Sequence, residues 1–137
     1  MPAIFLDASA LVPMVVTRDQ WRPALVRVMQ GLRRAGQPSF VTTNWTLYEA
    51  LALCRRTSHD IALSLYESAA SQMQIAAVSG RTEAEALARF IRWRDQGASV
   101  VDHANLLVAV ETRCEAILSF DSDFKPIARA AGLRLLG

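Results

Sequence analysis

The sequence predicts a three-layer α/β domain in which a central, mostly parallel sheet of about five strands lies between two layers of helices. Short apolar runs alternate with longer segments of helical periodicity, and most of these runs are apolar on both faces, as in the strands of a covered parallel sheet. The chain has 137 residues, of which 52% are hydrophobic and 20% charged. This length and composition suit one compact core, so we expect a single domain over residues 1–137.

Five short apolar runs are predicted to be strands, and six longer segments between them are predicted to be helices. The strands are expected at residues 3–6, 38–42, 74–79, 116–120 and 133–136. The helices are expected at residues 18–35, 44–57, 58–72, 80–96, 102–113 and 122–131. No internal repeat, linker or low-complexity tract interrupts this alternation, which favours one continuous α/β unit.

The lengths of the apolar stretches and the cysteine spacing argue against a membrane protein and against a zinc-binding protein. No apolar stretch approaches the roughly 18–20 residues of a membrane span, so we expect a cytoplasmic protein. Cys54 and Cys114 are 60 positions apart without zinc-ligand spacing and are expected to be buried thiols. Of 15 basic residues, all but Lys125 are arginine, which suits phosphate recognition but follows equally well from a GC-rich gene.

Carboxylates follow two of the predicted strands at the point where each strand ends. Asp7 follows the first strand in AIFLDASAL, and Asp121 follows the fourth in ILSFDSDF. In open parallel sheets, ligands bind beyond the carboxyl ends of the strands, at the point where the strand order reverses. Glu49 in NWTLYEALAL and Asp102 in ASVVDHANLL lie near the starts of helices that flank the same edge. We therefore expect these acids to meet.

Each acid also has an ordinary explanation, but the set of four is harder to explain without a cation. Asp102 and Asp121 can act as helix caps. Glu49 lies between Leu47 and Leu51, and a carboxylate on a partly buried helix face is costly unless it is paired or binds a metal. Two carboxylates about 5 Å apart repel by about 3 kcal/mol at an effective dielectric constant near 20. Oxygen ligands without thiolates favour Mg²⁺ or Mn²⁺ over zinc.

Ser9, Ser119 and Asp123 lie beside the acids, and each of them has two possible roles. The hydroxyls of Ser9 and Ser119 can orient a carboxylate or a metal-bound water, or they can bond the local backbone. Asp123 can contribute to a second metal or complement a helix dipole. His103 follows Asp102 directly, and adjacent helical residues point about 100° apart, so we do not expect it to act as a general base.

The combination of FLDASAL, the glutamate of TTNWTLYEALAL, SVVDHANLLVAV and LSFDSDF resembles a PIN domain, and within that family the VapC-type toxins of bacterial toxin–antitoxin pairs. The resemblance covers essentially the whole chain and implies a metal-dependent ribonuclease. Its acidic site corresponds here to Asp7, Glu49, Asp102 and Asp121, with Asp123 as an auxiliary member. The resemblance also implies a cognate antitoxin that blocks the pocket, and a homodimer. The family more often has threonine at the position of Ser119.

The resulting hypothesis is hydrolysis of RNA phosphodiester bonds by Mg²⁺ or Mn²⁺ bound to Asp7, Asp102, Asp121 and Glu49, leaving a 5′-phosphate and a 3′-hydroxyl. Positive charge near the site is expected to hold the RNA. The candidates are Arg18, Arg22, Arg55 and Arg56. Trp45 can stack on a base or belong to the core. Leucines that lie in predicted helices can form the dimer surface or the core, and these are Leu47, Leu51, Leu63 and Leu65.

Two other readings of the sequence remain open. FLDAS also resembles the start of haloacid-dehalogenase-like phosphatases, in which Asp7 would accept the phosphoryl group. That chemistry requires an aspartate where this chain has Ser9, together with a suitably placed lysine, and Lys125 is the only one. Alternatively, the chain is an inactive or non-toxin PIN module that binds a protein or RNA partner.

Overall fold

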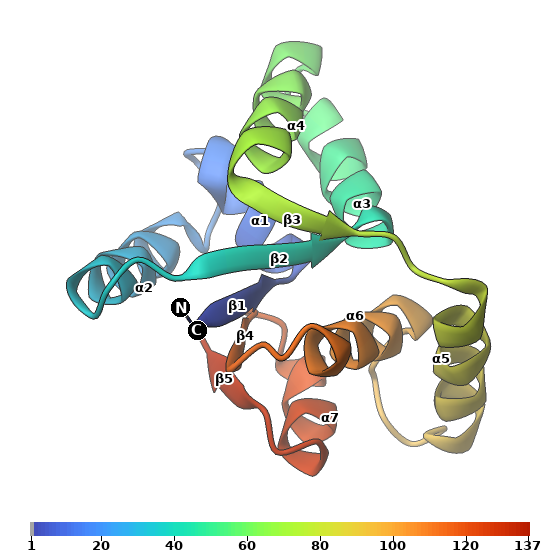
Figure 1. Ribbon diagram of the computed structural model, residues 1–137. Coiled ribbons are helices and arrows are strands. Elements are labelled where there is room, and N and C mark those ends of the chain that lie inside the picture. Colours follow the sequence, from blue (N-terminus) through green and yellow to red (C-terminus); the bar gives the residue numbers. More distant parts are fainter. Residues whose placement is uncertain (1) are drawn as a thin grey trace.

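The structure is a computed structural model that describes residues 2–137, and it contains one five-stranded parallel sheet (Figure 1). The strand order is β3-β2-β1-β4-β5, and every neighbouring pair is parallel. The strands are β1 (Ala3–Leu6), β2 (Ser39–Thr43), β3 (Met73–Ala76), β4 (Ala116–Leu118) and β5 (Arg134–Leu136). The predicted three-layer α/β architecture is confirmed, although the third and fourth strands end earlier than expected.

Helices cover both faces of the sheet. The helices on one side are α1 (Ala8–Val15), α2 (Arg22–Arg34), α3 (Asn44–Arg55) and α4 (His59–Gln72). Those on the other side are α6 (Val100–Glu111) and α7 (Lys125–Ala130), with α5 (Gly80–Arg92) packed against α6. Alternate residues of β1 separate the two cores, since Ile4 and Leu6 pack on the α1 side whereas Phe5 packs on the α6 side.

Hydroxyl side chains fix where four of the helices begin. The side chains of Thr43, Ser58, Ser79 and Ser99 each accept a hydrogen bond from the backbone N–H three residues further on. Such caps satisfy donors that have no partner within the helix. The N-termini of α3, α4, α5 and α6 are therefore specified locally by the sequence.

Helix α1 was not predicted, and the predicted helix over residues 18–35 begins later, at Arg22. The residues of α1 are apolar on most sides and include Pro13, so they lack the one-sided periodicity of an amphipathic helix. Arg22 completes this helix, because its Nη1 donates to the carbonyl oxygens of Pro13 and Met14 at 2.9 Å each. Residues 16–21 are therefore a loop between two helices.

The strand order reverses at β1, which lies between β2 and β4. Leu6 of β1 is opposite Leu118 of β4, and the backbone N–H of Asp7 donates to the carbonyl oxygen of Leu118 at 3.2 Å. The first and fourth strands are therefore adjacent, which is the condition for the acids at their ends to be neighbours. Asp7 and the residues after Leu118 therefore lie together at the point where ligands bind in open parallel sheets.

Within residues 2–137, none of the helices has both the length and the apolar character that crossing a membrane requires.

Candidate active site

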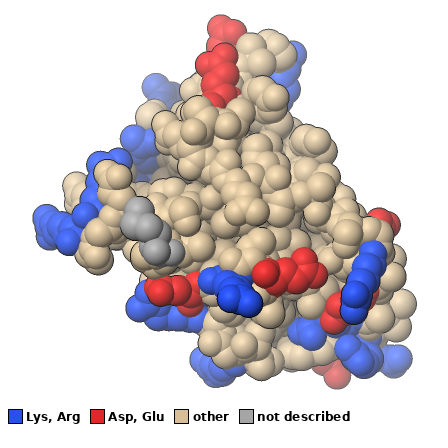
Figure 2. Space-filling model, in the orientation of Figure 1, with Lys and Arg blue, Asp and Glu red and all other residues tan. Residues whose placement is uncertain are grey.

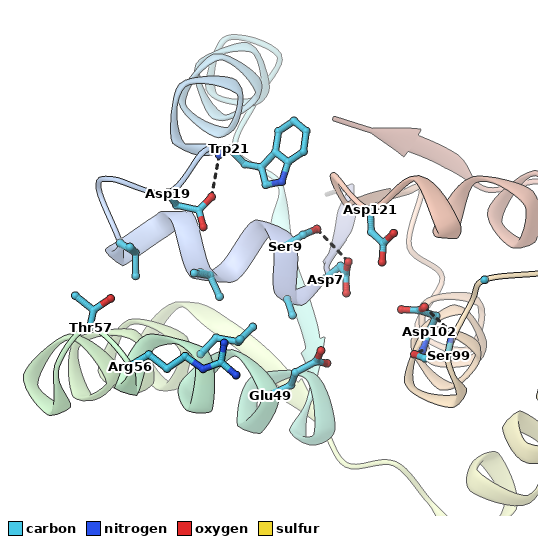
Figure 3. Close-up of a pocket in the computed structure, with 15 residues that line it drawn as sticks. Asp7, Ser9, Asp19, Trp21, Glu49, Arg56, Thr57, Ser99, Asp102 and Asp121 are labelled. Carbon is cyan, nitrogen blue, oxygen red and sulfur yellow. Dashed lines mark hydrogen bonds between the residues drawn. The ribbon is translucent and has the colours of Figure 1, made fainter.

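A pocket of about 550 Å³ opens at the carboxyl edge of the sheet and contains the four predicted acids. Asp7 follows β1, Asp121 follows β4, Glu49 belongs to α3 and Asp102 to α6. Figure 3 shows their carboxylates converging on the same space from different elements. Residues far apart in the sequence are thus brought together at one edge of the sheet, as predicted.

Asp7 is held by two serines that bind the same carboxylate oxygen. Ser119 Oγ donates to Asp7 Oδ2 at 2.8 Å, and Ser9 Oγ donates to the same atom at 3.1 Å. Each serine also accepts a backbone N–H, Ser9 from Phe120 at 2.9 Å and Ser119 from Asp121 at 3.1 Å. Both proposed roles of these hydroxyls therefore operate together, and the Asp7 carboxylate has a fixed orientation.

Asp102 and Asp121 each also use one carboxylate oxygen to bind the backbone. Asp102 Oδ2 accepts from the N–H of Ser99 at 2.8 Å, and Ser99 Oγ in turn accepts from the N–H of Asp102 at 3.1 Å, which forms a capping box. Asp102 is therefore the third residue of α6, and Ser99 is the cap. Asp121 Oδ1 accepts from the N–H of Asp123 at 2.9 Å at the start of a short 3₁₀ helix, Ser122–Phe124. One oxygen of each carboxylate fixes its position, and the other is left for a ligand.

Burial and mutual repulsion raise the pKa values of three of the acids. Desolvation is the largest cause for Asp7, and the charge of Asp121 adds to it, although hydrogen bonds from Ser119 and Ser9 oppose the shift. Desolvation, with the charges of Asp7 and Asp121, raises the pKa of Asp102 to about 6. The pKa of Glu49 is raised by desolvation and by the same two charges. The acids are thus close enough to affect one another's ionisation.

The exposure of the Glu49 side chain differs from the prediction. We expected its helix face to be partly buried, but the side chain is exposed, whereas its neighbours Leu47 and Ala50 are buried. The exposed Glu49 carboxylate lies on the α3 wall of the pocket and lacks the fixed hydrogen bonds of Asp7 and Asp102 among the described residues 2–137. No hydrogen bond from residues 2–137 therefore fixes the orientation of the Glu49 carboxylate.

The spacing of the acids bears on the predicted metal. Among residues 2–137, no three His, Cys, Asp or Glu side chains lie close enough together to surround an ion directly. Mg²⁺ takes one or two protein carboxylates and keeps several of its waters, so it does not require a tight cage. A pocket in which Asp7, Asp102 and Asp121 each keep one carboxylate oxygen without a hydrogen bond from residues 2–137 fits a hard, partly hydrated cation of this kind.

Asp123 and His103 lie outside the lining of the pocket. Asp123 is exposed, and its carboxylate lies directly against Gly97, which lines the pocket. A Cβ added at Gly97 would lie only 2.5–2.9 Å from the atoms of this carboxylate. His103 is fully buried on the α5 side, where its Nδ1 accepts from Arg89 Nε at 3.4 Å and its ring meets Trp93 edge-on. The expectation that His103 points away from the acids is confirmed.

Of the four predicted arginines, Arg56 lies in the lining of the pocket, beyond Glu49 along α3. Arg18 and Arg55 are exposed outside the lining, whereas Arg22 completes α1 and borders a separate pocket of about 670 Å³. Figure 2 shows basic side chains gathered over α2 and α5, with few charges on the central part of that face. The basic side chains therefore do not form one continuous patch on that face. Of the four predicted arginines, Arg56 is the one best placed to meet a phosphate in the pocket.

Sequence reasoning missed several residues of the pocket wall. Asp19 and Trp21 were assigned to a helix, but they belong to the loop before α2 and line the pocket together with Thr57 and Ser99. The signal that could have revealed the loop is Pro23, because proline is favoured in the first turn of a helix. A helix that starts at Arg22 places Asp19 and Trp21 in a connection at the sheet edge.

A parallel sheet covered on both faces, with carboxylates meeting at the point where its strand order reverses, defines a small α/β/α domain with an acidic edge site. The family model of the PIN domain matches residues 4–130, and the chain belongs to this family. Membership and the position of Lys125, exposed at the start of α7 and outside the pocket lining, both count against the phosphatase alternative.

Solved structures of three other proteins share this fold. VapC20 of Mycobacterium tuberculosis, described as a sarcin–ricin loop cleaving toxin, is 24% identical, with 95% of each chain covered and a TM-score of 0.77. VapBC2 of Rickettsia felis, bound to a DNA fragment from its promoter, is 13% identical, with 97% of this chain and 96% of that chain covered and a TM-score of 0.68. FitAcB of Neisseria gonorrhoeae is 13% identical, with 98% and 96% covered and a TM-score of 0.63. None of the curated proteins matches this chain.

Proposed function

We propose that this PIN domain is a metal-dependent endoribonuclease and the toxin of a toxin–antitoxin pair. The observation that carries the proposal is the convergence of Asp7, Glu49, Asp102 and Asp121 in one pocket, where the charge of Asp121 contributes to the raised pKa values of the other three. Such repulsion is characteristic of a site that binds a cation. RNA as the substrate rests on the PIN-family resemblance and on the description of the similar VapC20 as a sarcin–ricin loop cleaving toxin.

Asp7, Asp102 and Asp121 would hold Mg²⁺ or Mn²⁺, one or two of them directly and the rest through the waters that the ion keeps, with Glu49 acting directly or through water and Asp123 as an auxiliary member. When bound, the ion would lower the pKa of a water molecule and polarise the scissile phosphate. The contribution of the chain is to hold these carboxylates in place. Ser9 and Ser119 fix Asp7, the capping box fixes Asp102, and the Asp123 backbone fixes Asp121.

The approach of RNA to an acidic pocket requires positive charge nearby. Arg56 supplies it in the pocket wall, and the exposed Arg18 and Arg55 extend it outside the lining. A guanidinium can bind a phosphate through two parallel N–H donors. Arg56 would therefore position the RNA backbone opposite the carboxylates, whereas Arg22 is already engaged by the carbonyls of α1.

The direct test is cleavage of single-stranded RNA by the purified protein with Mg²⁺, with Mn²⁺ and with a chelator. We expect cleavage with either ion, no cleavage with the chelator, and products that carry a 5′-phosphate and a 3′-hydroxyl. Equal cleavage in all three samples, or products with a 2′,3′-cyclic phosphate, would rule out the metal-dependent mechanism. A protein that binds RNA or another protein without cleaving RNA under any of these conditions would support the inactive PIN module.

The antitoxin partner is implied by the family resemblance and is supported by the similarity to VapBC2 and FitAcB. A partner segment that places a basic side chain among the carboxylates would relieve their repulsion and block the site. We expect a short neighbouring reading frame to encode a DNA-binding protein that forms a complex with this chain and stops RNA cleavage. Such a toxin would act in the cytoplasm. A neighbouring product that binds without inhibition would contradict this assignment.

Homodimerisation is also part of the proposal, but the leucines suggested for it need correction. Leu47 and Leu65 are buried in the core, Leu51 is half-buried, and Leu63 is exposed. Leu63 therefore stays a candidate for the dimer surface, and large apolar side chains are also exposed on α5 and α6, at Leu87, Phe90, Ile91 and Val110. Light scattering should give the mass of a dimer for the purified protein. A monomeric mass over the full concentration range would remove this element of the proposal.

A further inference from the structure

Two aromatic rings form a stack at the wall of the acidic pocket. The rings of Trp21 and Phe120 are 5.2 Å apart between centroids, with an angle of 7° between their planes. Phe120 is partly buried against the core, whereas Trp21 is 38% exposed and lines the pocket (Figure 3). Phe120 is thus the inner ring of the stack, and Trp21 is the outer one.

The stack is connected to the acidic site by short hydrogen bonds. The backbone N–H of Phe120 donates to Ser9 Oγ at 2.9 Å, and Ser9 Oγ donates to Asp7 Oδ2 at 3.1 Å. Phe120 is also the residue directly before Asp121. On the other side, the N–H of Trp21 donates to Asp19 Oδ1 at 2.8 Å. The stack on Phe120 and the backbone bond to Asp19 therefore hold Trp21 at the pocket wall near Asp7 and Asp121.

The chemistry of this surface suits an unpaired nucleobase. The carboxylates repel the phosphates of RNA, whereas a base is uncharged and can stack on an exposed aromatic ring beside them. Bases within a duplex are already stacked and paired, so a ring at the pocket wall can accept a base from a single-stranded segment or a loop. Since only Trp21 of the stack is exposed at the pocket, it is the residue that would contact the base.

We propose that Trp21 is a stacking platform for an unpaired base next to the scissile phosphodiester. This inference rests on the proposed ribonuclease function and adds a residue that binds the substrate. Trp21 is a binding residue that holds the substrate beside the acids.

The test measures the binding of a labelled single-stranded oligoribonucleotide by fluorescence anisotropy, in an Asp7→Asn background so that the RNA remains intact. Trp21→Leu should weaken binding by about tenfold, the scale expected for the loss of one base–aromatic stack. Trp21→Phe, which keeps a ring, should bind within about twofold of the background protein. The matched control is Tyr66→Leu, which removes an exposed aromatic ring from α4 outside the pocket and should have no effect.

A series of oligonucleotides, each with one abasic nucleotide at a different position, identifies the base that Trp21 contacts. At the stacked position, the abasic RNA and Trp21→Leu should each weaken binding, and combining them should cause no additional loss. Additive losses at every position, or unchanged binding by Trp21→Leu, would overturn the proposal. So would a Trp21→Phe loss as large as that of Trp21→Leu, and a complete absence of RNA binding.

This experiment separates failure of the inference from failure of the proposed function. Trp21-dependent binding without metal-dependent cleavage by the protein with Asp7 intact would retain the platform and remove the nuclease. Metal-dependent cleavage with the same KM and kcat in Trp21→Leu would retain the nuclease and remove the platform. If both are correct, Trp21→Leu raises KM for single-stranded RNA by about tenfold and leaves kcat at saturating RNA nearly unchanged.

Discussion

Asp7→Asn is expected to lower the rate of RNA cleavage by about a hundredfold to a thousandfold, because the cation that would stabilise the reacting phosphate loses a charged ligand. Asp7 is 5% exposed and lies at the centre of the site, where Ser9 and Ser119 hold it and the charge of Asp121 is near. Asparagine has nearly the same shape and can accept the same serine hydrogen bonds. The substitution therefore removes the charge and leaves the geometry largely unchanged.

The same variant should be more stable than the wild-type protein when no divalent cation is present. Burial and the neighbouring Asp121 raise the pKa of Asp7, so its ionised form is unfavourable in the folded protein at neutral pH. Asp7→Asn removes that cost, and its melting temperature in chelator should rise by a few degrees. The stabilisation that Mg²⁺ gives the wild-type protein should be small or absent in the variant, because ligand-linked stability requires binding to the folded state.

Asp60→Asn is the matched control, since it makes the same substitution at an exposed carboxylate in the first turn of α4, outside the pocket. It should cleave RNA at the wild-type rate and keep the Mg²⁺-dependent rise in melting temperature. Wild-type cleavage by Asp7→Asn would show that the acidic site is not the nuclease site. A lower melting temperature of Asp7→Asn in chelator would show that Asp7 stabilises the fold.

Asp102 should make the protein less stable as the pH rises from about 4 to about 6. Its pKa is raised from 3.8 to about 6 in the folded state, mainly by burial and then by the charges of Asp7 and Asp121. In this interval the folded protein retains a proton that the unfolded chain has lost, so the free energy of unfolding falls with pH. At about 1.4 kcal/mol per pKa unit, the decrease due to Asp102 is about 3 kcal/mol, and it is complete above the folded pKa.

The measurement is chemical denaturation in chelator at several pH values, with wild type and Asp102→Asn compared. Asparagine can still accept the N–H of Ser99, so the capping box is largely retained while the titration is removed. The wild-type curve should fall between pH about 4 and about 6, and the variant curve should fall less, because only Asp7 and Glu49 still contribute in the same direction. Parallel curves for the two proteins would mean that Asp102 titrates normally in the folded state.

Much of the candidate site could be predicted because it depends on local rules. Apolar runs that end in Asp7 and Asp121 place these residues at strand ends, and the carboxyl ends of parallel strands share one edge. The sequence did not reveal α1, because its residues are apolar around the whole helix and include Pro13. As a result, Asp19 and Trp21 were assigned to a helix, and the outer ring of the aromatic stack was missed.

The sequence by itself determined the class of fold, the family and the acids of the candidate site, since periodicity, strand ends and motif spacing are local properties of the chain. Only the tertiary structure decided which oxygen of each carboxylate is engaged, that Glu49 is exposed, and that Trp21 lies beside the acids. These features depend on distances between residues such as Asp7 and Ser119, which are 112 positions apart in the sequence. Such distances are set by the packing of helices on the sheet, which no local pattern encodes.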